Sequence, residues 1–196
     1  LSEWVERFAG WIDSPTPQAL LEAAIFFDFR RVAGILELDP LEALAAQAVK
    51  RPVFLRFLAK AALDFRPPPA IVLRLKGESS TVDLKRQGIS PVVFLARCYG
   101  LEVGSRARNT LQRLDAAHEA GLLGDDVWAE VTQAYRFLVG LRLRWQLRLL
   151  ASGKPATDQV ALSDLDAIER SRLKDSYRAI RSWQEMAAYH YQVDFV

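Results

Sequence analysis

Three arginines stand out because each lies within or beside an apolar stretch of the sequence. Arg97 interrupts the apolar run of residues 92–103, and Arg30 follows a phenylalanine-rich cluster at 26–29. Arg142 lies one helical turn before Gln146, in a segment whose apolar residues recur every three or four positions. Such a repeat is typical of a helix that faces the inside of a bundle. We therefore expect these guanidinium groups to lie in or against a helical core.

A guanidinium in a helical core needs compensation, because an unpaired buried charge is strongly unfavourable. One alternative is an internal salt-bridge network, in which Arg97 or Arg142 pairs with Asp28 or Asp83. The other is a site for an anion such as phosphate, which fits the planar fork of the guanidinium group. Spacing alone favours the salt bridges, and the sequence leaves both alternatives open.

The sequence contains no complete catalytic set. Nucleophilic triads need a base beside the nucleophile, yet the two histidines, His118 and His190, lie among polar helical residues and are expected to be solvated or capping. Zinc would need several Cys or His ligands, which this chain lacks. The acidic pairs 125–126 and 164/166 lie where helices begin and are better explained as caps than as metal ligands. We therefore predict no active site, metal or cofactor within this chain.

The composition is that of an ordinary globular protein. Of the 196 residues, 51% are hydrophobic and 26% are charged, and the net charge is only +2. Because the basic residues are spread along the chain, no dedicated nucleic-acid surface is expected. Cys98 is the single cysteine, so no intrachain disulfide can form, and no apolar run is long enough to cross a bilayer. These features predict a cytoplasmic protein that does not enter a membrane.

Helical patterns fill most of the sequence. Proline, glycine and N-cap signals predict helices over 2–12, 17–34, 40–51, 52–65, 92–103, 110–121, 125–150 and from a capping box at Ser163 and Asp166 onward. The period-two pattern at 71–85 predicts a small β-hairpin, or alternatively an ordered loop. The expected fold class is therefore all-α, an antiparallel helical bundle with this one excursion. Because Trp4 is already in helical phase, we expect residues 1–14 to be a leading helix from the junction with a missing upstream domain, and residues 15–196 to form the bundle.

A series of short motifs follows in a fixed order along the chain. They are Phe26–Arg30, Asp83–Lys85 with Gly88 and Pro91, Leu95–Arg97, Asn109–Thr110 with Arg113 and Leu114, Leu141–Gln146, and Leu173–Lys174 with Gln184. In this order and register they resemble the nucleotidyltransferase substrate-binding domain family, over nearly the whole chain. Two positions depart from the family pattern. Trp145 stands where a histidine is common, and Lys154–Asp158 replaces the usual Pro-Asp-Asn form.

The resemblance implies a helical bundle packed against a separate catalytic nucleotidyltransferase domain in the same parent chain. It is similar to the helical domain of enzymes that adenylylate glutamine synthetase or uridylylate the PII protein. CBS and cyclic nucleotide-binding domains often precede both domains, which implies signal transduction, while Mg²⁺ and a nucleoside triphosphate would belong to the catalytic domain. Carried over position by position, the candidate substrate-binding residues are Arg30, Asp83, Lys85, Arg97, Asn109, Arg113, Arg142, Gln146 and Lys174.

Two functions follow from these observations. As a substrate-binding domain, the chain would position the acceptor or nucleotide for transfer, with Arg97, Arg142 and Lys85 supplying positive potential and Asn109 and Gln146 orienting polar groups. As an interaction module, it would mediate dimerisation or transmit signals from upstream sensor domains, with the aromatic face of its first helix as the docking surface.

Overall fold

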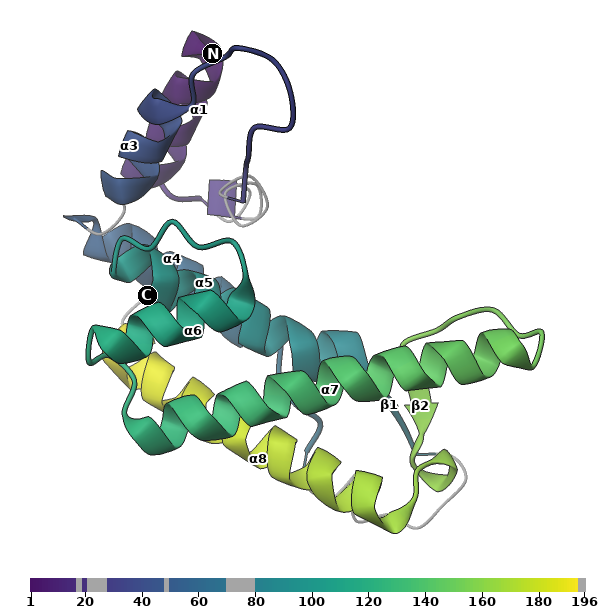
Figure 1. Ribbon diagram of the computed structural model, residues 1–196. Coiled ribbons are helices and arrows are strands. Elements are labelled where there is room, and N and C mark those ends of the chain that lie inside the picture. Colours follow the sequence, from purple (N-terminus) through teal and green to yellow (C-terminus); the bar gives the residue numbers. More distant parts are fainter. Residues whose placement is uncertain (17–18, 21–27, 48–49, 70–79, 194–196) are drawn as a thin grey trace. The chain divides into compact units, whose positions relative to one another are not determined.

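The computed structural model describes residues 1–16, 19–20, 28–47, 50–69 and 80–193 (Figure 1). Helices predominate, which confirms the all-α prediction, and none in these ranges is long and apolar enough to cross a membrane. The helices are α1 (Ser2–Asp13), α3 (Asp39–Gln47), α4 (Pro52–Leu63), α5 (Ser90–Glu102), α6 (Thr110–Glu119), α7 (Asp125–Ala151) and α8 (Ala167–His190). A π-helical turn, η3 (Lys85–Ile89), precedes α5, and a short 3-10 helix, η4 (Leu162–Asp164), precedes α8.

The chain divides into two compact units, each assembled from separate stretches of sequence. Unit 1 comprises Leu1–Asp64, Phe94–Leu123 and Ala187–Val196. Unit 2 comprises Phe65–Val93 and Gly124–Met186. The expected division into a leading helix at 1–14 and a bundle at 15–196 stays a prediction.

Several helices begin where local chemistry specifies a start. Asn109 caps α6, because its Oδ1 accepts a hydrogen bond from the N–H of Leu111 at 2.8 Å. Pro52 occupies the first position of α4, where its missing N–H costs nothing. Thr16 Oγ1 accepts a hydrogen bond from the N–H of Ala19 at 3.1 Å, as expected for a helix start. These starts confirm the sequence prediction.

Two predicted helix boundaries were wrong. The helix expected to reach residue 34 does not extend through residues 28–38, and its stretch at 21–27 lies outside the described residues. At 28–29 the chain instead makes long-range polar contacts with α5 and with residues 105–113. The capping box of α8 consists of Asp166 and Glu169, whose side chains each accept from the other's N–H, at 2.7 and 3.4 Å. Ser163 cannot serve as the cap because it lies within η4.

Unit 2 contains a two-stranded antiparallel sheet. Strand β1 (Thr81–Asp83) pairs with β2 (Gln159–Ala161), with Val82 opposite Val160. Both valines are fully buried. The strand at 81–83 agrees with the β-pattern in the sequence, and the partner that the structure describes for it lies far along the chain. The rest of the predicted hairpin, at 71–79, lies outside the described residues, so the hairpin itself stays a prediction.

The aromatic face of α1 is largely buried inside unit 1. Phe8 is 2% exposed and Trp11 6%, whereas Trp4 is 38% exposed. The Phe8 ring also packs edge-on against Phe29, with ring centroids 5.5 Å apart. Most of the face expected to dock on another domain therefore belongs to the core of this unit.

Gly88 of η3 gives a test of the packing in unit 2. A Cβ at this position would lie 3.0 Å from Cδ1 of Leu138 and 3.2 Å from Cε1 of Tyr177, two fully buried side chains. We therefore expect Gly88→Ala to lower the free energy of unfolding, measured by urea denaturation, by about 1–3 kcal/mol. The control is Gly140→Ala in α7, where the nearest atom is the flexible end of Arg144 at 3.4 Å. That change should be neutral or stabilise by up to about 1 kcal/mol, and equal effects at both glycines would contradict the expectation.

Candidate functional site

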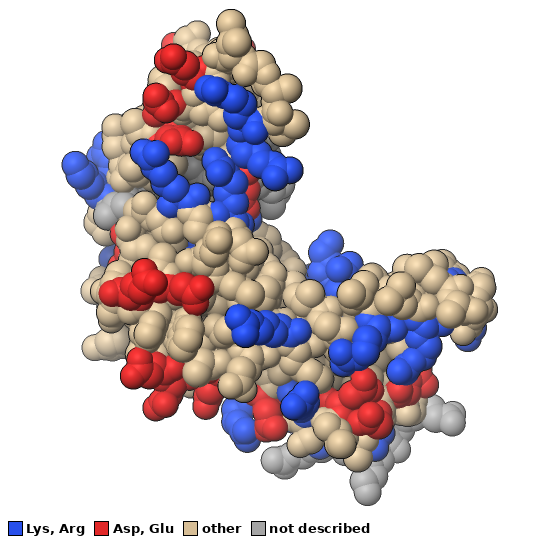
Figure 2. Space-filling view, viewed as in Figure 1, with Lys and Arg blue, Asp and Glu red and all other residues tan. Residues whose placement is uncertain are grey.

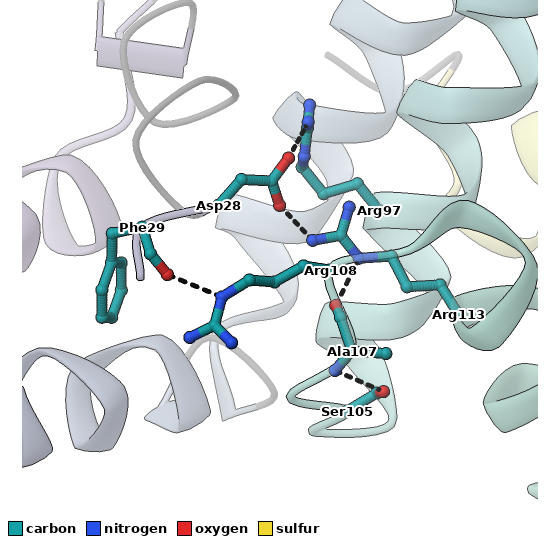
Figure 3. Close-up of polar contacts among 7 residues, drawn as sticks. All are labelled: Asp28, Phe29, Arg97, Ser105, Ala107, Arg108 and Arg113. Atoms are coloured by element: carbon teal, nitrogen blue, oxygen red, sulfur yellow. Dashed lines mark hydrogen bonds and ion pairs between the residues drawn. The ribbon is translucent and has the colours of Figure 1, made fainter. Parts of the chain in front are cut away.

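In unit 1 the carboxylate of Asp28 is shared by two arginines from different helices (Figure 3). Arg97 on α5 donates from Nη2 to Asp28 Oδ2 at 2.5 Å. Arg113 on α6 donates from its Nη2 to the other oxygen, Oδ1. The side chains of Arg97 and Arg113 are 8% and 7% exposed, whereas that of Asp28 is 31% exposed. The carboxylate therefore lies at the edge of a buried cationic pair.

The position of Arg113 follows from the residues around it. The Asn109 cap starts α6 so that Arg113 falls one turn into the helix. Gly100 of α5 has no side chain, and a Cβ there would lie only 2.9 Å from Cγ of Arg113. The arginine stem therefore lies against the backbone of α5, and its Nε donates to the carbonyl oxygen of Ala107 at 2.8 Å. Arg113 is thus fixed at its stem and at its guanidinium group.

The cluster of Asp28, Arg97 and Arg113 carries a surplus of positive charge. Two guanidinium groups face one carboxylate, and Nε and Nη1 of Arg97 have no hydrogen-bond partner among the described residues. The guanidinium carbon of Arg97 lies 5.4 Å from the ring centroid of Phe94, a cation–π contact that offsets part of this charge. Burial acts to raise the pKa of Asp28, but the hydrogen bonds and charges of Arg113 and Arg97 outweigh it and hold the pKa below the usual 3.8.

A small pocket of about 60 Å³ borders this cluster within unit 1. Three arginines, Arg106, Arg108 and Arg113, line it together with one carboxylate, that of Glu42. Glu42 pairs with Arg106 at 3.1 Å and with Arg108 at 3.8 Å, and Arg108 Nε donates to the carbonyl oxygen of Phe29 at 2.7 Å. Since one water occupies about 30 Å³ of liquid, the pocket has room for two waters or one small oxyanion.

A second arginine–carboxylate cluster lies in unit 2, where β2 meets α7. Asp158 Oδ1 accepts hydrogen bonds from Arg142 Nε at 2.6 Å and from Gln146 Nε2 at 2.9 Å. The N–H of Leu84 donates to the carbonyl oxygen of Asp158, which extends the β1–β2 pairing. Trp145 joins the same arrangement, because its indole N–H donates to the carbonyl oxygen of Gln159 at 2.9 Å. The loop that departs from the family pattern therefore supplies the carboxylate that holds Arg142.

The nine predicted substrate-binding residues fall into two groups. Arg30, Arg97, Asn109 and Arg113 belong to unit 1, and Asp83, Lys85, Arg142, Gln146 and Lys174 belong to unit 2. The structure brings Arg97 together with Arg113, and Arg142 together with Gln146. Asp83 is linked to the second cluster through Gln159, whose Nε2 donates to it at 2.9 Å. Arg30, Lys85 and Lys174 are exposed and have no side-chain partner among the described residues, and Asn109 serves as a helix cap.

Of the predicted salt bridges, that of Arg97 with Asp28 is present, whereas Arg142 pairs with Asp158. Sequence reasoning missed the role of Asp158, and it also missed Arg106, Arg108 and Glu42 of the small pocket. The one available signal was the Arg-Ala-Arg-Asn run at 106–109, which places cations directly before a capped helix start.

The structure provides little for nucleophilic chemistry in the described ranges. Burial raises the pKa of Cys98 to about 12, so its thiol is protonated at neutral pH. No group of three or more His, Cys, Asp and Glu side chains within those ranges could hold a metal ion. In both clusters, arginine cations are instead held by a carboxylate.

Comparison with known proteins adds two matches. The family model described as "Putative nucleotidyltransferase substrate binding domain" matches residues 52–191. The chain is also 38% identical over 78 residues to a bifunctional glutamine synthetase adenylyltransferase/adenylyl-removing enzyme of Ralstonia nicotianae. This alignment covers 37% of the chain but only 8% of that much longer enzyme. No solved structure matches the chain.

The shared carboxylate leads to a stability prediction. We expect Asp28→Asn, which keeps the shape of the side chain, to lower the free energy of unfolding by up to about 3 kcal/mol, because two buried guanidinium groups lose their compensating charge. Asp175→Asn is the matched control, since Asp175 is 55% exposed and pairs with an exposed arginine. That change should cost less than about 1 kcal/mol. Urea denaturation at pH 7 measures both.

The lowered pKa of Asp28 gives this prediction a pH dependence. Because the pKa is lower in the folded state, the ionised carboxylate contributes its full stability above the unfolded-state pKa and loses it as the pH falls through the folded-state pKa. The difference in unfolding free energy between wild type and Asp28→Asn should therefore be constant near neutral pH and shrink below about pH 4. A difference that stays the same down to pH 2 would mean that the charge of Asp28 does not stabilise unit 1.

Proposed function

Because this chain belongs to the family of nucleotidyltransferase substrate binding domains, we propose that it holds an anionic group of the acceptor or nucleotide for transfer by a separate catalytic domain. That catalytic domain would lie in the same parent chain and would carry Mg²⁺ and the nucleoside triphosphate. The adenylyltransferase of Ralstonia nicotianae is similar over part of its length, which agrees with nucleotidyl transfer as the reaction of the parent protein.

The observation that carries the proposal is the surplus of positive charge beside the small pocket of unit 1. Among the described residues, Asp28 and Glu42 are the carboxylates that pair with these arginines, whereas Arg97, Arg106, Arg108 and Arg113 provide four cations. An oxyanion in the pocket would complete this charge balance and accept hydrogen bonds from guanidinium groups.

In this proposal, the role of each arginine depends on whether its side chain lines the pocket. Arg113 and Arg108 line the pocket and would contact the anion, while Asp28, which also binds Arg97, holds the guanidinium group of Arg113 in place. Fixed cations of this kind contribute to transfer by positioning the substrate and by offsetting its charge, without reorganising during the reaction. Arg142 and Gln146, anchored on Asp158, are assigned to the architecture of unit 2 rather than to substrate contact.

Phosphate-dependent stability tests this function. We expect sodium phosphate to raise the melting temperature of the wild-type chain more than potassium chloride does at equal ionic strength, because a bound anion stabilises the folded state. Arg108→Ala removes a lining cation that is 44% exposed, so it should leave the fold intact and weaken phosphate binding about tenfold. Arg7→Ala on α1, also an exposed arginine of unit 1, is the control and should bind as wild type. A phosphate effect that equals the chloride effect, or that survives Arg108→Ala unchanged, would refute the proposal.

One observation favours the alternative function as an interaction module. Val139, Leu143, Leu147 and Leu150 recur at helical spacing along α7 and are 40–57% exposed. A helix with apolar residues on several faces is normally buried against other protein surfaces. The same stretch, 139–151, holds three arginines and no carboxylate, which opposes pairing with the same face of a second copy. We infer that an acidic, apolar surface of the catalytic domain would fit this face.

Sedimentation with a separately produced catalytic domain tests this alternative. Leu143→Ser with Leu147→Ser should weaken a complex by tenfold or more, because docking would bury the half of each side chain that is exposed in the free chain. Ile168→Ser, which alters a leucine-sized side chain that is 71% exposed on α8, is the control. Wild type that sediments as a monomer in the presence of the catalytic domain would exclude docking through α7.

A further inference from the structure

A larger hollow lies within unit 2, in the groove bordered by α7 and α8, which run in opposite directions (Figure 1). Its volume is about 670 Å³. The small residues Ala134, Ser176 and Ala179 line it and are 4%, 6% and 9% exposed. Because these buried side chains are short, they leave space between the helices that longer residues would fill. The groove is therefore built into the packing of α7 against α8.

Arginines form the sides of this groove. Arg136 and Arg144 come from α7, and Arg172 and Arg178 come from α8. The carboxylates that line it are those of Glu130 and Asp175. Four cations therefore face two anions, and Figure 2 shows Lys and Arg side chains along this face with Asp and Glu side chains among them.

Two of the four arginines are available to a ligand. Arg178 is paired with Asp175 at 2.6 Å, and Arg144 lies 3.7 Å from Glu169. Arg136 and Arg172, one from each helix, have no ion-pair partner among the described residues. A surplus of surface arginines is commonly only a solvated face. Here the two unpaired arginines lie on different helices and border the same hollow. A face that is merely solvated would not need arginines in this arrangement.

We propose that this groove binds the phosphate groups of a nucleotide-sized ligand. A guanidinium group binds two oxygens of one phosphate through parallel hydrogen bonds, and arginines on both sides hold a chain of phosphates from two directions. The volume lies within the range of small-molecule and cofactor sites, about 300–1,000 Å³. The ring of Phe137, which also lines the groove, offers an apolar surface for the rest of the ligand. Every lining residue belongs to unit 2, so this site is independent of the pocket proposed in unit 1.

Isothermal titration of the full chain with ATP, tripolyphosphate and adenosine tests the proposal. ATP and tripolyphosphate should bind and compete with each other, whereas adenosine alone should bind at least tenfold more weakly. Arg136→Ala and Arg172→Ala should each weaken ATP binding about tenfold, because each removes charge-assisted hydrogen bonds. Arg86→Ala changes an exposed arginine of unit 2 outside the groove and should bind as wild type.

A steric variant separates a shaped site from charge alone. Ala179→Leu narrows the groove without altering any charge and should also weaken ATP binding tenfold or more, with circular dichroism confirming that the chain is folded. Equal affinity in wild type, Arg172→Ala and Ala179→Leu would overturn the proposal. So would an acidic peptide, poly-glutamate, that binds more tightly than tripolyphosphate at equal charge, since the groove would then be a peptide site. Arg108→Ala in unit 1 should leave ATP binding in the groove unchanged, so this proposal and the proposed function fail separately.

Discussion

The shared carboxylate of Asp28 sets the main constraint on unit 1. Arg97 and Arg113 come from two helices, and both guanidinium groups are almost completely removed from water. The free energy cost of removing two cations from water exceeds the stabilisation that one carboxylate provides. Further contacts must therefore stabilise the two guanidinium groups. The ring of Phe94, the carbonyl oxygen of Ala107 and the close approach to Gly100 provide them. The position of α6 on α5 therefore depends on a cluster in which, among the described residues, two guanidinium groups pair with one carboxylate.

The ion pairs also distinguish arginines that are held by a carboxylate from arginines that are available to bind a ligand. Arg113 and Arg142 are each held by an internal carboxylate, Asp28 and Asp158 respectively. In unit 2, Arg136 and Arg172 have no such anchor among the described residues. Apolar surroundings in the sequence thus led to Arg97 and Arg142, which are held by internal carboxylates. Arg136 and Arg172, which have no ion-pair partner among the described residues, lie in ordinary amphipathic helices. Burial alone is a poor guide to function in this domain.

Local sequence signals predicted much of the fold. The parts that could not be predicted depend on pairings between residues far apart in the sequence. The starts of α4 and α6 follow from Pro52 and Asn109, because a cap acts within one turn of its helix. The pairing of Val82 with Val160 could not be foreseen, since three residues carry too little pattern to identify a distant partner. The same limit applies to the site. Arg97 with Asp28 was among the expected pairs, whereas Asp158 looked like a loop residue until β2 placed it beside α7.

Both units are discontinuous in sequence, and this has a consequence for biosynthesis. Unit 1 needs Ala187–Val196, where Tyr191 donates to Glu102 of α5 at 2.7 Å, and unit 2 needs the stretch up to Met186. A ribosome releases the chain from its N-terminus, so neither core can close before α8 has left the exit tunnel. Until that point the nascent chain would expose apolar helix faces, which favours aggregation. Truncation within α8 would then remove part of both units rather than trim one of them.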